Sequence, residues 1–145
     1  MMHRRSALAY VMLLAATHLL TGCALTERKV DIVDYARAYP QELERVESLD
    51  IQVLRAPQSV QLTNTSSRAF GACTLWLNAE FSRPVDAFAV GQTLELPLAD
   101  FRNVYSEKFR AGGFFATLDP TPLVLVEIEE SGRRYPLVVV QDILE

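Results

Sequence analysis

The chain has 145 residues, a formal net charge of −4 and two histidines, and its length suits one domain or at most two. Both histidines lie within the first 22 residues. The rest of the chain therefore lacks the imidazole that Ser-His-Asp and Cys-His catalysis, histidine-ligated zinc and histidine-held haem require. The negative charge and the absence of a basic run also argue against a nucleic-acid partner.

The first 22 residues have the pattern of a signal peptide. Arg4 and Arg5 form a short basic start, and the chain from Ser6 to Leu20 is apolar except at three positions. A transmembrane helix needs about 20 consecutive apolar residues, and this run is shorter and is interrupted by His18. We therefore predict that residues 1–22 are removed from the mature protein.

The sequence Leu-Thr-Gly-Cys at positions 20–23 resembles the bacterial lipobox. The resemblance implies cleavage after Gly22, a diacylglyceryl group on the sulfur of Cys23 and an acylated new amino terminus. Three acyl chains would anchor the protein in a membrane permanently, because each buried methylene adds about 0.8 kcal/mol. Ala24, which is not the Asp that retains some lipoproteins at the inner membrane, favours the outer membrane, with the protein facing the periplasm. The alternative is an ordinary cleaved signal peptide with a free Cys23.

Removal of residues 1–22 would leave a more acidic chain with one unassigned cysteine. The segment holds two of the 14 basic residues and none of the 18 acidic residues, so the remainder has a formal charge of −6. If Cys23 carries lipid, Cys73 has no partner for an internal disulfide. Because Cys73 lies in an apolar stretch, we expect it to be an inert core residue.

Residues 23–48 are predicted to form a lipidated tether with short helical stretches. Ile32, Ala36 and Tyr39 follow a helical spacing, which ends at Pro40. Pro40 is also a favourable first residue for a second helical turn or two. Helices this short are marginal unless they pack on something, so we expect their apolar side chains to lie against the domain. A docking helix for a partner is the alternative.

From residue 49 onward the hydrophobic period changes to two, and residues 49–145 are predicted to form one domain. About seven short strands bounded by turn residues predict an all-β fold, a single antiparallel two-sheet sandwich of immunoglobulin-like or fibronectin-like size. An open barrel is the alternative. Ser131 and Gly132 are expected to form a turn. The expected strands are residues 49–53, 60–63, 73–78, 85–90, 94–98, 123–128 and 137–140. The side chains expected in the core include Leu75, Leu77, Leu94, Leu96, Val126 and Val139.

Two stretches of this domain carry a second resemblance. Leu-Thr-Asn-Thr-Ser at residues 62–66, followed by Leu-Trp-Leu-Asn at residues 75–78, makes the domain similar to uncharacterised bacterial envelope proteins with a small sandwich. The similarity extends over most of residues 49–140. It implies a fold and a cellular location, and no activity.

The sequence contains no recognisable catalytic or metal-binding motif. Carboxylates such as Glu80, Asp86 and Glu107 are scattered through expected loops, and neither a calcium loop nor a phosphate-binding glycine loop is present. We therefore expect a non-enzymatic binding or assembly module of the cell envelope, with an envelope protein as its partner and with no cofactor or metal. The alternatives are a lipid or glycan carrier and a carboxylate-dependent hydrolase.

Residues 101–115 do not follow the strand rhythm and contain five of the eleven Phe and Tyr residues that follow residue 22. We interpret them as a long connection with a short strand near Phe114, whose rings cap one end of the sandwich and are mostly buried. Loops on a rigid scaffold often bind partners, and aromatic and Arg side chains dominate interfaces, so recognition is expected here. The candidate partner-binding residues are Trp76, Arg102, Phe109, Arg110, Phe114 and Phe115.

Overall fold

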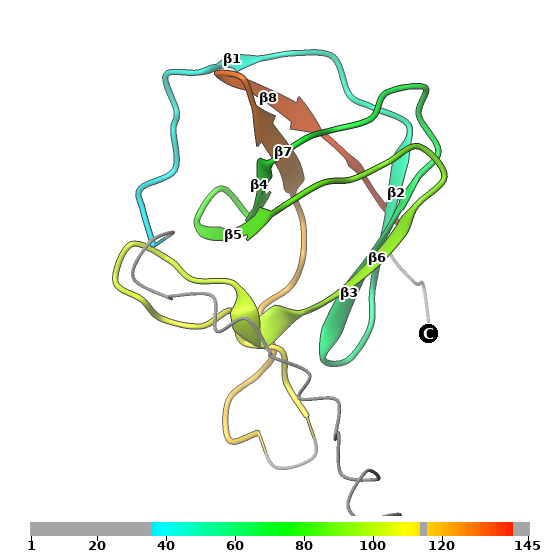
Figure 1. Ribbon diagram of the computed structural model, residues 1–145. Helices are drawn as coiled ribbons and strands as arrows, with labels where there is room; N and C mark the ends of the chain where they lie inside the picture. Colours follow the sequence, from blue (N-terminus) through cyan, green and yellow to red (C-terminus); the bar gives the residue numbers. More distant parts are fainter. Residues whose placement is uncertain (1–35, 114–115, 141–145) are drawn as a thin grey trace, which may run out of the picture. The chain divides into compact units, whose positions relative to one another are not determined.

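The computed structural model describes residues 36–113 and 116–140, which form two β-sheets packed face to face (Figure 1). One sheet has five strands in the order β1-β8-β7-β4-β5, and the other has four in the order β6-β3-β2-β9. The predicted all-β two-sheet sandwich is therefore confirmed. The strands are β1 (Glu44–Arg45), β2 (Ile51–Arg55), β3 (Ser59–Asn64), β4 (Cys73–Leu77), β5 (Phe81–Val85), β6 (Thr93–Pro97), β7 (Val126–Glu130), β8 (Arg133–Pro136) and β9 (Val138–Val140).

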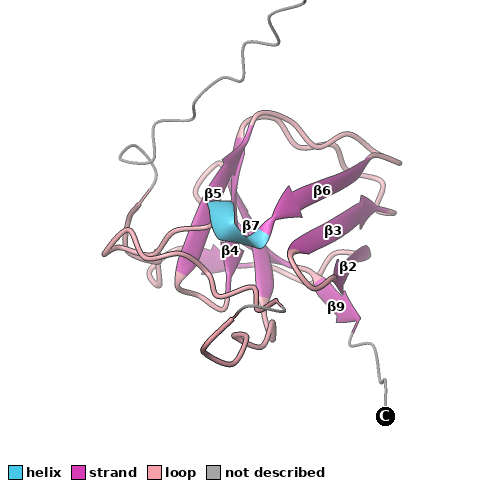
Figure 2. Cartoon of the chain, turned by 90° about the horizontal axis from the view of Figure 1, so that it is seen from below, coloured by secondary structure: helices cyan, strands magenta, loops and turns pink. Residues whose placement is uncertain are grey.

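The core lies between the sheets because each sheet turns one apolar face inward. On β2, Ile51 and Val53 are fully buried while Gln52 and Leu54 are exposed, as the two-residue period of a strand requires. A short 3₁₀ turn, η2 (Leu98–Asp100), follows β6 and lies at one end of the sandwich (Figure 2). Of the six side chains expected in the core, Leu75, Leu77, Leu96 and Val126 are buried, and Leu94 and Val139 are partly buried against it.

Two strand pairs are parallel, so the expectation of a purely antiparallel sandwich is wrong at these pairs. Strand β1 runs parallel to β8, and β9 runs parallel to β2. Strands β8 and β9 follow each other in the chain but belong to different sheets, so β9 pairs with β2 and not with β8. The chain crosses between the sheets at Leu137, which is buried and donates its backbone N–H to the carbonyl of Val126 (2.9 Å).

The hydrophobic pattern located most strands but displaced one and missed another. The strand expected at residues 85–90 is wrong except at Val85, because the strand in this region is β5, whose Ser-Arg-Pro sequence does not follow an apolar alternation. Strand β8 was not predicted separately because it begins with two arginines. The expected turn at Ser131 and Gly132 is confirmed: both have positive φ (52° and 74°), as a tight hairpin turn between β7 and β8 requires.

The segment that was expected to continue as a helical tether forms part of the domain. We call residues 36–46 the strap. No described strap residue is helical, and the helical turn expected after Pro40 is wrong: Glu44–Arg45 forms β1, which pairs with β8. The backbone N–H of Val46 donates to the carbonyl of Arg134 (2.9 Å), which extends this pairing. In Figure 1 the strap runs along the side of the five-stranded sheet that faces away from the four-stranded sheet. Residues 23–35 lie outside the described part.

The strap covers Trp76 on the outer face of the five-stranded sheet. Trp76 lies between Leu75 and Leu77 on β4, so it points to the face opposite the core, yet it is fully buried. The ring of Tyr39 meets the Trp76 ring edge to face, with 5.3 Å between centroids. The guanidinium of Arg37 lies 5.1 Å from the centre of the Trp76 ring, a cation–π distance. An outer-face tryptophan is thus buried by the segment that precedes the expected domain.

Beneath the strap, the outer face of the five-stranded sheet also contains a buried carboxylate, that of Glu127 on β7. Its side chain accepts hydrogen bonds from Arg45 Nε (2.9 Å) and from the hydroxyl of Tyr39. Arg134 Nη1 lies 3.5 Å from the same carboxylate. Arg134 Nη2 also donates to the carbonyl of Leu43 (2.9 Å). These charges are paired, so polar contacts hold the strap on the outer face together with the packing of Tyr39 on Trp76. Burial, followed by the hydrogen bond to Glu127, raises the pKa of the Tyr39 hydroxyl.

Cys73 at the start of β4 leads to a prediction about pH. Burial, with a smaller contribution from Glu130, raises the pKa of the Cys73 thiol to about 11 from an ordinary value of 9.0. As the pH rises from about 9 to about 11, the unfolded chain loses this proton and the folded protein keeps it. The free energy of unfolding should therefore fall across that range. Urea unfolding at several pH values measures this slope.

The variant Cys73→Ala is the control, because it removes the thiol and leaves other groups that ionise at high pH. Its loss of stability between pH 9 and pH 11 should be smaller than that of the wild type. An identical slope in both proteins would contradict the assignment of this pH dependence to Cys73.

Candidate functional site

Residues 101–115, in which recognition is expected, begin in the core at Phe101 and return to it at Phe109. Phe101 and Phe109 are buried, and the backbone N–H of Phe109 donates to the carbonyl of Phe101 (3.2 Å). The ring of Phe109 packs edge to face on Phe81, with 5.2 Å between centroids. Phe109 therefore anchors the loop from the core, as expected for most of these rings, and its side chain is not offered to a partner as its place among the candidates would require. Phe114 and Phe115 lie outside the described residues.

Trp76 and Arg102 are also buried, so neither candidate residue offers its side chain to a partner at the surface. Trp76 lies under the strap. Arg102 Nη1 donates to the carbonyl oxygens of Phe101 (3.3 Å) and Ala99, which are residues of its own loop. The backbone of Arg102 pairs with Ser82 in both directions, at 2.8 and 3.0 Å. Arg102 thus holds this connection against β5 and has no charge to offer at the surface.

Residues 103–107 form the loop tip of this segment, which is exposed at residues 104–107 and is organised by the buried side chain of Asn103. The Oδ1 atom of Asn103 accepts hydrogen bonds from the backbone N–H groups of Tyr105 (3.0 Å) and Glu107 (2.9 Å). Its backbone N–H donates to the carbonyl of Glu107 (3.1 Å). This closed loop presents Val104, which is 49% exposed, and Tyr105, which is 80% exposed. Tyr105 is therefore a large aromatic side chain displayed on a fixed backbone.

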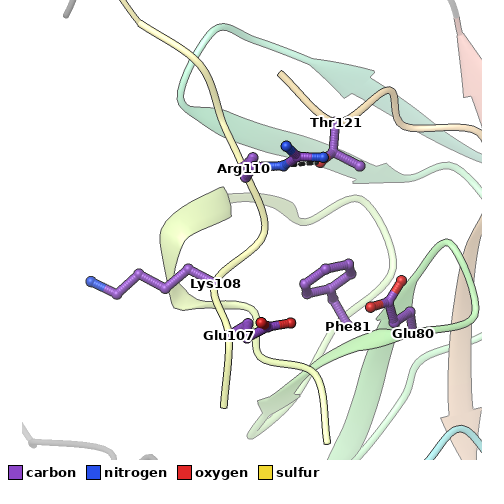
Figure 3. Close-up of a pocket in the computed structure, with 6 residues that line it drawn as sticks. All are labelled: Glu80, Phe81, Glu107, Lys108, Arg110 and Thr121. Carbon is purple, nitrogen blue, oxygen red and sulfur yellow. Dashed lines mark hydrogen bonds between the residues drawn. The ribbon is translucent and has the colours of Figure 1, made fainter. Parts of the chain in front are cut away.

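A cavity of about 420 Å³ lies beside the loop tip (Figure 3). Phe81 from β5 lies between the side chains of Glu80 and Glu107, and Arg110 and Thr121 lie on the opposite side. Arg110 Nε donates to the Thr121 hydroxyl (3.2 Å), and this hydrogen bond orients the guanidinium. The residues that line the cavity are Glu80, Phe81, Glu107, Lys108, Arg110 and Thr121.

Asn103 also brings two carboxylates of the cavity together. Its Nδ2 atom donates to Glu107 Oε2 (2.7 Å) and to Glu80 Oε1 (3.1 Å), so both oxygens lie within hydrogen-bonding distance of one nitrogen. Glu80 is the last residue of the β4–β5 turn, in which Asn78 and Ala79 have positive φ values of 53° and 55°. The turn of one hairpin and the loop tip therefore meet through a single amide side chain.

The structure places the six candidate partner-binding residues in different environments. Of the six candidate residues, Arg110 is exposed and lines the cavity, whereas Trp76, Arg102 and Phe109 are buried. Glu80 and Glu107 were treated as scattered loop charges, because 27 positions separate them. The one local signal was Asn103, four residues before Glu107, since Asn side chains commonly close such turns.

The cavity beside the loop tip and a second cavity both have mixed linings, in which polar and charged side chains outnumber apolar ones. The second cavity, of about 390 Å³, is lined by Gln58, Ser59, Glu95 and Pro97. An apolar ligand carrier requires an apolar cavity, and neither of these two has such a lining. None of the described residues belongs to a helix that is long and apolar enough to cross a membrane.

Comparisons with protein-family models, with curated proteins and with solved structures found no match to this chain.

Proposed function

We propose that the chain is a lipid-anchored lipoprotein of the bacterial cell envelope whose β-sandwich acts as a non-enzymatic binding or assembly module. The anchor would be Cys23 in the outer membrane, with the domain facing the periplasm. The Leu-Thr-Gly-Cys sequence at positions 20–23 and the apolar run before it support this anchoring. The bound partner would be another protein of the envelope.

The exposed side chain of Tyr105 is the observation that carries the binding role. Asn103 holds the backbone of the loop tip in one conformation, so little further entropy is lost when a partner binds there. Tyrosine contributes strongly to protein interfaces because it combines a large apolar ring with a hydroxyl and few rotatable bonds. A rigid loop that displays such a residue favours a protein-binding surface.

The anchoring is tested by labelling with palmitate in a bacterial host. The label should enter the wild-type chain and should not enter Cys23→Ala. In the wild type, thiol titration after denaturation should find one thiol per chain, that of Cys73, because the sulfur of Cys23 is acylated. The matched control Cys73→Ala should keep the label and show no thiol. Equal labelling of the wild type and Cys23→Ala would exclude the proposed anchor.

The binding role is tested by photo-crosslinking from the loop tip in the native envelope. A photoreactive amino acid placed at Tyr105 should capture one defined protein. The same group placed at Val90, an exposed apolar residue in the loop before β6, is the control and should not capture it. In addition, Tyr105→Ala should lower co-purification of that protein at least tenfold and leave the melting temperature unchanged. Capture of the same protein from both positions would contradict a role for the loop tip.

A carboxylate-dependent hydrolase is the second candidate, and the closeness of Glu80 and Glu107 favours it. Retaining glycosidases use two carboxyl groups about 5 Å apart, one of which must donate a proton. Asn103 donates a hydrogen bond to both groups here, an arrangement that uses both as acceptors. We therefore rank the binding role first. Hydrolysis of an aryl glycoside that is abolished by Glu80→Gln and by Glu107→Gln would reverse this order.

A further inference from the structure

The cavity beside the loop tip holds two carboxylates, those of Glu80 and Glu107. In the part of the chain that the structure describes, neither Glu80 nor Glu107 forms an ion pair. Asn103 orients both groups but is itself neutral, so their negative charges add at the mouth of the cavity. The carboxylates that do form ion pairs are Glu44, Asp100, Glu127, Glu129 and Glu130.

The two cationic residues of the cavity are directed elsewhere. Arg110 is turned toward Thr121 on the opposite side, and the Lys108 side chain extends away from the other lining residues (Figure 3). The carboxylates therefore remain available to a cation from outside the chain.

The aromatic ring of Phe81, which lies between the two carboxylates, favours an ammonium or guanidinium group as that cation. Phe81 is largely buried and lies between Glu80 and Glu107 in the cavity (Figure 3). Ammonium and guanidinium groups gain from carboxylates and from an aromatic ring together, because their charge is attracted to the ring and their methylenes pack on it. On the opposite side, the Nη groups of Arg110 can donate to a carbonyl oxygen. The cavity therefore suits a cationic side chain next to its own peptide carbonyl.

We propose that this cavity binds a lysine or arginine side chain of the protein partner, while Tyr105 and Val104 pack on the partner surface beside it. The proposal rests on the proposed function and specifies the chemistry of the partner. Charge complementarity supports it, because the chain after residue 22 carries a formal charge of −6, and the two carboxylates, which form no ion pair among the described residues, lie next to the exposed loop tip. A cavity of about 420 Å³ has room for one such side chain.

Calorimetric titration of the full chain in detergent micelles tests the inference. The probes are three blocked tripeptides, Gly-Xaa-Gly, in which Xaa is arginine, lysine or citrulline, the neutral analogue of arginine. We expect the arginine and lysine peptides to bind and citrulline to bind at least tenfold more weakly, because it lacks the charge. Glu80→Gln and Glu107→Gln should each weaken arginine binding about tenfold. Asp86→Asn, at an exposed carboxylate outside the cavity, should leave it unchanged.

Three outcomes would overturn the inference. Equal binding of the arginine and citrulline peptides to the wild type would show that the charge does not contribute to binding, and this result does not depend on whether the variants fold. Absence of peptide binding to the folded wild type would show that the cavity does not bind a cationic side chain. Binding of Ca²⁺ or of phosphorylethanolamine through Glu80 and Glu107 without peptide binding would assign the cavity to a metal ion or a lipid headgroup. Melting temperatures confirm that the variants are folded.

Failure of this inference is distinguishable from failure of the proposed function. If position 105 crosslinks to a defined partner and the peptides do not bind, the binding module stands and the cavity plays no part in it. If the peptides bind but palmitate does not enter at Cys23, the cation site stands and the anchoring is wrong.

Discussion

Replacing Glu127 with alanine should lower the free energy of unfolding by about 3 to 5 kcal/mol, because it leaves buried charge without a partner. The Glu127 side chain is 1% exposed and lies between Arg45 and Arg134. Arg134 is itself 10% exposed, so it cannot turn to water without opening the strap. The hydroxyl of Tyr39 would lose its acceptor as well. Urea unfolding of the wild type and the variant measures the difference.

The matched control for this prediction is Glu44→Ala. Glu44 pairs with Arg133 at 3.0 Å, but both side chains are more than half exposed, so the pair contributes about 0 to 1 kcal/mol. Both changes remove a carboxylate that contacts an arginine, and they differ in burial. If Glu127→Ala and Glu44→Ala destabilise the protein equally, the network beneath the strap does not stabilise the fold.

Replacing Trp76 with alanine should lower the free energy of unfolding by about 3 to 5 kcal/mol, the usual cost of removing a buried large aromatic side chain. The loss includes the edge-to-face contact with Tyr39 and the hydrogen bond from Trp76 Nε1 to Glu129 (2.7 Å). It also removes the surface on which Arg37 lies. Limited proteolysis should therefore cleave the strap faster in this variant.

Leu54→Ala is the control for Trp76→Ala, since Leu54 lies on the outer face of the other sheet and is 41% exposed. It should change the stability by less than about 1 kcal/mol and leave the rate of strap cleavage unchanged. Fluorescence gives a second measurement, because Trp76 is the one tryptophan of the chain. Its emission should shift to longer wavelength in Tyr39→Ala. An unshifted spectrum would show that the strap does not shield the ring.

The fold class followed from the sequence because a strand with one buried face has a local signature. The alternation of Leu75 and Leu77 with polar or outer-face residues marks the inward side of β4, and the same pattern marks β2, β3 and β6. The turn at Ser131 and Gly132 is equally local, because two successive residues with positive φ need particular residue types. These features depend on neighbours within a few positions.

The sequence indicated that this segment packs on the domain but predicted the wrong conformation for the strap, because its stabilising contacts are non-local. Tyr39 and Ala36 have a spacing that suits a helix, but Tyr39 packs on Trp76, 37 positions later. Glu127 on β7 is separated from Arg45 by 82 positions. A short helix in water is marginal, so contacts with a completed sheet outweigh the local preference. The same reason applies to Trp76, whose burial depends on a segment that lies outside its own sheet.

By itself, the sequence determined the all-β class, the positions of most strands, the hairpin turn and the chain region in which an exposed loop occurs. Only the tertiary structure decided that Arg102 is buried and that Tyr105 is exposed. It also decided that Glu80 and Glu107 meet at Asn103. Alternation along a strand is set by bond geometry and can be seen within a few residues. The pairing of distant side chains is set by how two sheets and their loops pack, and no short stretch of sequence contains that information.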